Sequence, residues 1–150
     1  MSDNHDERAM LVLEKAVYRA QELLEKTQNF KPFLMILDDD GNIDIVENEV
    51  QDSTESYALL GDTLRVRIQE GGVDVMVMVV DTLIPENFVQ NVPSSIRLHL
   101  EEKSQVDKSV AARFIYVPYT LHKVEEGEVF SKLHTPIPVG FPAEYIVKGT

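Results

Sequence analysis

The sequence predicts an α+β domain of two layers, in which two helices pack on a mostly antiparallel sheet of about five strands. Three observations support this class. Residues 73–85, VDVMVMVVDTLIP, form the longest nearly uninterrupted apolar run, and their β-branched valines favour a strand. Two other segments carry apolar residues at spacings of three and four, as helices do. Several more alternate between apolar and polar residues, as half-buried strands do. The predicted order is helix, strand, strand, helix and then three strands.

The run from Val73 to Pro85 is predicted to be the central strand. Alternation puts four valines on one face, and two methionines and a valine on the other: Val73, Val75, Val77 and Val79 against Met76, Met78 and Val80. Neither face is polar enough to contact water, so both need cover. If both helices lie on one face, the C-terminal tail or a second subunit must cover the other. The run is too short to span a bilayer, which takes about 20 apolar residues.

The first predicted helix covers residues 4–26, and acidic residues at its start suit the positive end of the helix dipole. Its apolar residues form one wide stripe: Met10, Leu13, Val17, Ala20 and Leu24, broadened by Ala9, Val12, Ala16 and Leu23. A stripe this wide favours packing on a sheet, although the helix could also form part of a dimer interface. Residues 1–5 are expected to be flexible.

Two strands, residues 33–37 and 42–47, are predicted to form a hairpin through the acidic turn at residues 38–41. In the second strand, Ile43 and Ile45 are expected to face inward and Asp44 outward.

The second predicted helix begins with the capping-box pattern Asp52-Ser53-Thr54-Glu55 and ends before Gly71, which occupies a typical C-terminal capping position. Gly61 lies in the middle of this helix on its apolar face. Since glycine weakens a helix by up to about 1 kcal/mol relative to alanine, a close approach to the sheet beneath would explain it.

The C-terminal half is predicted to add strands at residues 96–101 and 111–117, the first of which alternates strictly between apolar and polar residues. A further hairpin is expected between residues 119 and 134, with its turn at residues 125–128. Residues 135–150 contain Pro136, Pro138 and Pro142, and this tail is expected to run extended across the surface.

The order of elements from residue 4 to residue 117 resembles that of the profilin-like folds, such as the roadblock and longin domains. The resemblance implies an architecture only, because it includes no diagnostic motif that would assign a functional residue. The final helix of those folds is replaced here by the proline-rich tail.

Composition and charge limit the possible partners. With 150 residues, 43% hydrophobic and 27% charged, the chain suits a single soluble globular domain spanning residues 1–150. Its net charge of −12 opposes binding to nucleic acids and to anionic membrane surfaces, which attract Lys and Arg. The absence of cysteine excludes disulfides and Cys-based zinc sites, and the acidic N-terminus does not resemble a secretory signal. A cytoplasmic location is therefore expected.

The sharpest local motif is acidic. Asp38, Asp40, Asp44 and Glu47 resemble parts of a calcium-binding loop, with Gly41 at the expected glycine position. The first ligand position, however, is Ile36, and a strand precedes the motif where a helix is required. An acidic hairpin turn explains the same residues without a metal.

Candidate binding residues lie on two neighbouring strands. Arg97, His99 and Glu101 should share one outward face, where histidine could act as a base or ligand. Tyr116 and Tyr119 could stack a planar ligand nearby. The same five residues could equally be ordinary surface and core residues of a sheet.

No catalytic or cofactor-binding motif occurs. The chain contains neither a G-x-S-x-G elbow nor a phosphate-binding glycine pattern, so no cofactor is expected. We therefore expect a non-catalytic protein-interaction module that acts as a homo-oligomer, such as a homodimer, or binds another protein. The alternative is a small-molecule-binding protein or enzyme with a pocket near Arg97, His99, Glu101, Tyr116 and Tyr119.

Overall fold

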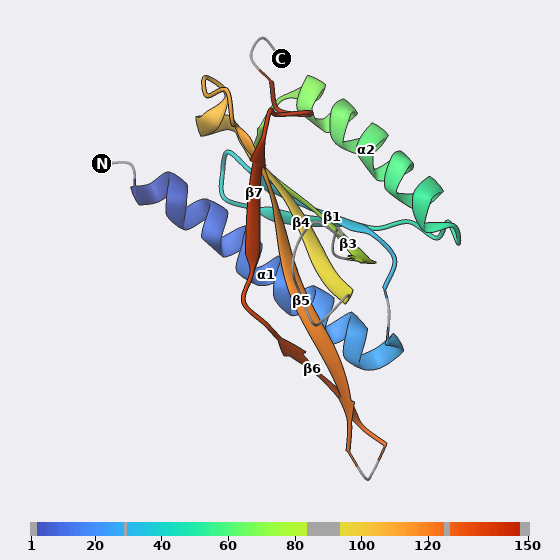
Figure 1. Cartoon of the computed structure of the whole chain (residues 1–150). Coiled ribbons are helices and arrows are strands. Elements are labelled where there is room, and N and C mark those ends of the chain that lie inside the picture. Colours follow the sequence, from blue (N-terminus) through green and yellow to red (C-terminus); the bar gives the residue numbers. More distant parts are fainter. Residues whose placement is uncertain (1–2, 29, 84–93, 125–126, 148–150) are drawn as a thin grey trace.

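The computed structural model describes residues 3–28, 30–83, 94–124 and 127–147. Its helices are α1 (Asp3–Thr27) and α2 (Ser53–Glu70), with a short 3-10 turn at Lys103–Gln105. Its strands are β1 (Phe33–Asp38), β2 (Ile43–Val46), β3 (Val73–Leu83), β4 (Ser94–Glu102), β5 (Ala112–Lys123), β6 (Val129–Leu133) and β7 (Ile137–Phe141). The α+β class and the predicted order of elements are confirmed (Figure 1).

The sheet has seven strands, more than the predicted five, and curves into a half-barrel. The strand order is β2-β1-β3-β4-β5-β6, and every described strand pair is antiparallel. β7 pairs with the first half of β5, from Ala112 to Tyr116, and β6 pairs with the second half, from Tyr119 to Lys123. The two C-terminal strands therefore share one long neighbour.

Part of the proline-rich tail belongs to the sheet, where the sequence predicts a surface tail. Residues 137–141 form β7, and Pro138 lies opposite Ile115 of β5. An edge strand tolerates proline because one of its sides needs no backbone donor. The central strand ends at Leu83 in the structure, and residues 84–85 of the predicted strand lie outside the described residues.

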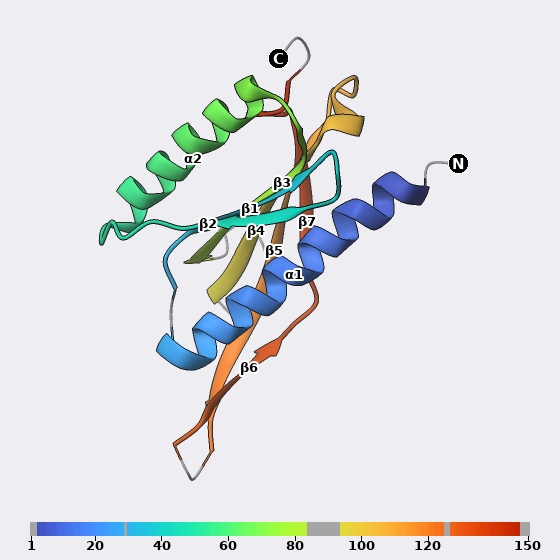
Figure 2. The ribbon, with the colours of Figure 1, turned by 180° about the vertical axis from the view of Figure 1, so that it is seen from behind.

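The two helices lie on opposite faces of the sheet (Figure 2), whereas the sequence predicts two layers. Val75, Val77 and Val79 of β3 pack in the core under α1, and Met76 and Met78 pack in the core under α2. The prediction that both faces of the central strand are covered is therefore confirmed, and a helix contributes cover on each face.

The structure departs from the predicted alternation of strand residues at two positions. A register shift between Leu37 and Asp38 places Val73 in the core under α2, so it does not share a face with Val75. Ile45 is 44% exposed rather than inward, because β2 is the edge strand of the sheet.

Both ends of α2 match their sequence signals. The Asp52 side chain accepts a hydrogen bond from the backbone N–H of Glu55 at 3.0 Å, and Gly71 ends the helix with a φ of +89°. Gly61 makes its close approach to Tyr145, not to the sheet. A Cβ atom at this position would lie 3.1 Å from Tyr145 Oη. Among the described residues, no helix combines the length and the apolar composition needed to cross a membrane.

Candidate functional site

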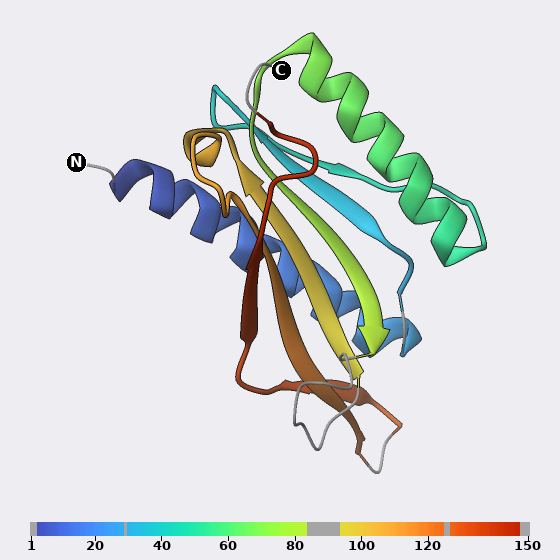
Figure 3. The same cartoon turned by 45° about the horizontal axis from the view of Figure 1, so that its top comes forward.

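The row Arg97, His99 and Glu101 lies on β4 and faces the α2 side of the sheet. The three side chains share this face, as predicted, opposite Tyr116, Phe114 and Ala112 of β5. The face is closed, however: His99 is 0% exposed and Glu101 is 1% exposed, and Arg97 alone is partly accessible. The chain after β7 runs back toward α2 and covers the row (Figure 3).

Glu101 anchors this C-terminal segment. Its carboxylate accepts backbone N–H groups from Glu144, Tyr145 and Ile146 at 2.9, 2.9 and 2.8 Å. His99 Nε2 lies 2.6 Å from Glu101 Oε2. Burial alone would raise the pKa of Glu101, but the hydrogen bonds from His99 and the three amides outweigh it and hold the pKa below its usual value. Four donors thus converge on one buried carboxylate.

Aromatic rings surround the His99 imidazole. The ring centroids of Phe114, Phe141 and Tyr145 lie 5.1, 5.1 and 5.5 Å from it, and His99 Nδ1 is buried without a hydrogen-bond partner among the described residues. A neutral imidazole protonated on Nε2 satisfies the contact with Glu101 and leaves only a lone pair on Nδ1. This environment suits a structural anchor, because neither His99 nor Glu101 has an open path to a substrate.

Arg97 and the two tyrosines are arranged differently from the prediction. The Arg97 guanidinium lies 4.7 Å from the Phe114 ring and 5.7 Å from the Tyr57 ring, as in cation–π contacts. Tyr116 is buried opposite Arg97. Tyr119 packs in the core on the other face of the sheet, because residues an odd number of positions apart on a strand point in opposite directions. The structure therefore brings four of the five candidates onto one face.

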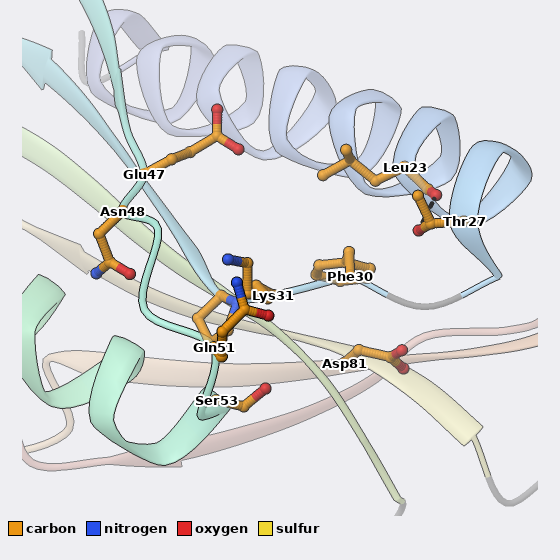
Figure 4. Close-up of a pocket in the computed structure, with 10 residues that line it drawn as sticks. Leu23, Thr27, Phe30, Lys31, Glu47, Asn48, Gln51, Ser53 and Asp81 are labelled. Atoms are coloured by element: carbon orange, nitrogen blue, oxygen red, sulfur yellow. Dashed lines mark hydrogen bonds between the residues drawn. The ribbon is translucent and has the colours of Figure 1, made fainter.

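A mixed pocket of about 620 Å³ lies among the C-terminal end of α1, residues 30–32 before β1, and the chain before α2 (Figure 4). Its lining includes Phe30, Lys31, Ser53 and Asp81. Burial raises the pKa of Asp81 although a 2.7 Å hydrogen bond from the Tyr119 hydroxyl acts in the opposite direction. Burial and the neighbouring Asp81 also raise the pKa of Tyr119. The sequence offers one signal for Asp81, an acidic residue inside the apolar run.

The acidic hairpin forms a local turn. Asp38 Oδ1 accepts backbone N–H groups from Asp40 and Asn42, both at 2.9 Å, and the bond from Asn42 is the main reason that the pKa of Asp38 is lowered. Asp44 pairs with Arg67 on α2. Glu47 pairs with Arg19 on α1. The described residues include no group of three or more His, Asp or Glu side chains arranged to hold a metal.

The α1 side of the sheet keeps apolar surface open. A groove of about 600 Å³ runs between α1 and strands β4 to β6, and its lining is mostly apolar: Met10, Leu13, Val17, Tyr18, Leu98, Ile115, Val117, Leu133 and Pro136, with Glu14 and Gln21. A second groove of about 680 Å³ lies on the other flank of α1, against β2. Tyr18 lines both grooves.

The outer face of α1 carries side chains that the sequence pattern missed. Ala9, Val12, Ala16, Ala20 and Leu24 form the buried stripe, whereas Met10, expected in it, is 53% exposed. On the side opposite this stripe, Tyr18 is 71% exposed and Leu11 is 42% exposed. Their spacing of seven residues, two helical turns, is the signal that could have placed them on one face.

Comparison with known proteins gives no match: no family model, no curated protein and no solved structure matches this chain.

Proposed function

We propose that this protein is a non-catalytic protein-interaction module that acts as a homo-oligomer. The observation that carries the proposal is the exposed outer face of α1, where Leu11 and Tyr18 contact solvent beside two grooves. An apolar patch of this kind on a soluble domain is typical of a protein-binding surface. Tyrosine in particular is enriched at the centres of interfaces.

The closed row on β4 supports a non-catalytic role. His99 and Glu101 are the pair that sequence reasoning would assign to acid–base chemistry, but His99 Nε2 bonds to the Glu101 carboxylate, which also accepts three backbone N–H groups of the C-terminal segment. A general base must reach a proton on its substrate, and both side chains are buried.

Charge and composition support a soluble protein in a reducing compartment. The chain has a net charge of −12 and no cysteine, which favours solubility and fits the cytoplasm. The same charge makes another copy of this chain, or a neutral protein surface, a better partner than nucleic acid.

Light scattering at several protein concentrations tests the proposal. We expect a mass that rises above that of the monomer as the concentration increases. A mass equal to that of one chain at every concentration would contradict it.

A second candidate function is small-molecule binding. The mixed pocket of Figure 4 shares Phe30, Pro32, Ser53 and Asp81 with a smaller cavity of about 210 Å³, which Arg97 also lines. Charged and aromatic side chains therefore border one continuous region whose size suits a small molecule. Titration with small polar fragments, followed by NMR, should perturb Ser53 and Asp81 if this function is correct. Amide signals that do not move would count against it.

A further inference from the structure

Asp81 is a half-buried carboxylate at the wall of the mixed pocket of Figure 4. The pairing of β1 with β3 ends at Phe33 opposite Val79, so Asp81 lies just beyond the last pair, beside the pocket. Its side chain accepts hydrogen bonds from the Tyr119 hydroxyl at 2.7 Å and from the backbone N–H of Phe30. Among the described residues, no ion pair includes Asp81, so its carboxylate has no counter-ion there.

The titration of Asp81 agrees with this isolation. Burial raises its pKa, and this effect exceeds that of the two hydrogen bonds, which act in the opposite direction. A cation beside the carboxylate would favour the ionised form and lower the pKa. A bound cation would therefore offset the cost of keeping this carboxylate ionised in the folded protein.

Other groups at this end of the pocket also suit a positive charge. The Phe30 ring lies between the end of α1 and Asp81 in Figure 4, and the face of an aromatic ring attracts cations. Leu23 and Thr27, in the last turns of α1, line the same region. The C-terminal end of a helix carries partial negative charge on its carbonyl groups. The carboxylate, the ring and the helix end therefore favour the same sign of ligand.

The basic residues near Asp81 do not neutralise it. Lys31 lines the pocket, but its side chain extends toward the side that holds Glu47, away from Asp81 (Figure 4). Arg97 lines the smaller neighbouring cavity, but it lies on the α2 side of the sheet. Asp81 instead bonds to Tyr119, which packs in the core under α1. The Asp81 end of the pocket thus keeps an uncompensated negative charge.

We infer that the Asp81 end of this pocket binds a small organic cation, a primary amine on a short alkyl chain, whose ammonium group contacts the Asp81 carboxylate. The alkyl chain would pack on Leu23, Phe30 and Pro32, which line the pocket. The net charge of −12 also raises the concentration of cations around the protein. This inference rests on the second candidate function and names its class of ligand.

An NMR titration with three molecules of equal chain length tests the charge preference. n-Butylamine should shift the amide signals of Phe30 and Asp81 and reach saturation, with a dissociation constant on the order of 1 mM for so small a ligand. The neutral 1-butanol should bind at least about tenfold more weakly, because it lacks the charge-assisted hydrogen bond. Butyrate should give no saturable shift of these signals.

Three variants test the role of Asp81. Asp81→Asn keeps an acceptor for the Tyr119 hydroxyl but removes the charge, and should weaken butylamine binding by about tenfold. Asp62→Asn removes the same charge from an exposed position on α2 and should change binding by less than about twofold. Tyr119→Phe removes a competing donor and keeps the carboxylate, so butylamine should bind at least as tightly as to the wild type. Circular dichroism checks that each variant is folded.

The outcomes separate the inference from the second candidate function. If 1-butanol binds as tightly as n-butylamine at the same residues, the pocket binds small molecules but the inferred preference for a cation is wrong. An equal loss of binding in Asp62→Asn and Asp81→Asn would indicate general attraction to an acidic surface and would also overturn the inference. Signals that stay unmoved with all three molecules, and with the small polar fragments, would overturn both.

Discussion

The two sides of the sheet cover their apolar surface in different ways. On the α2 side, Leu60 and Leu64 pack over the strands, and Tyr145 and Ile146 complete the cover. On the α1 side, the longer helix buries one stripe but leaves its outer face and two grooves open. The buried polar residues therefore belong to the sealed α2 side and hold the fold together, whereas the open α1 side carries the exposed surface to which we assign the proposed association.

Removal of the Glu101 carboxylate should destabilise the packing on the α2 side of the sheet more than any other change considered below. Glu101→Gln should lower the free energy of unfolding by about 3 kcal/mol, because an amide cannot satisfy His99 and three backbone N–H groups together. Urea denaturation measures the change, with Glu70→Gln as an exposed control. A loss below about 1 kcal/mol would show that the C-terminal segment does not depend on this carboxylate.

The pH dependence of stability should separate Glu101 from Asp81. The folded-state pKa of Glu101 is lowered, so its ionised form stabilises the fold above the usual glutamate pKa, and this stabilisation is lost as the pH falls toward the folded-state pKa. The pKa of Asp81 is raised, so its ionised form destabilises the fold at neutral pH, and this destabilisation is relieved as the pH falls through the folded-state pKa toward the usual aspartate pKa.

When Tm is measured from neutral to acid pH, the Tm of Glu101→Gln should therefore fall less than that of the wild type. The Tm of Asp81→Asn should fall more. Parallel curves for the wild type and Glu101→Gln would contradict the assigned role of Glu101.

A smaller effect should show how tightly α2 and the C-terminal segment fit. Gly61→Ala gains up to about 1 kcal/mol of helix propensity, but its Cβ would lie 3.1 Å from Tyr145 Oη. We expect the two effects nearly to cancel in the wild type. In a Tyr145→Phe background the crowding is relieved, so the same change should stabilise by about 0.5–1 kcal/mol. Equal effects in both backgrounds, measured by a double-mutant cycle, would exclude this coupling.

Local signals in the sequence predicted the local structure well. Asp52 and Gly71 were placed correctly at the ends of α2, because caps depend on a few neighbouring residues. The apolar run correctly indicated a strand covered on both faces. Alternation also placed Arg97, His99 and Glu101 correctly on one face.

The environment of that face depends on distant residues and could not be predicted. Glu101 accepts hydrogen bonds from amides more than 40 positions later in the chain, in a proline-rich tail that was expected to run extended across the surface. Tyr119 was grouped with Tyr116 by proximity in sequence, although an odd spacing on a strand separates them. Met10 fitted the helical period, but the edge of the contact between α1 and the sheet leaves it exposed.

The central claim is that the open side of the molecule, at the outer face of α1, joins two copies of the chain. Light scattering over a range of concentrations should compare the wild type with Leu11→Ser/Tyr18→Ser and with the matched control Leu59→Ser/Val66→Ser on α2. Both double variants remove two exposed apolar side chains seven residues apart. Since these side chains contact solvent in the monomer, each single change should alter monomer stability by no more than about 0.5 kcal/mol.

We predict a mass approaching twice that of the chain for the wild type and the α2 control, and the mass of one chain for Leu11→Ser/Tyr18→Ser. A dimer that persists in Leu11→Ser/Tyr18→Ser, or that is lost only in the α2 control, would contradict the claim.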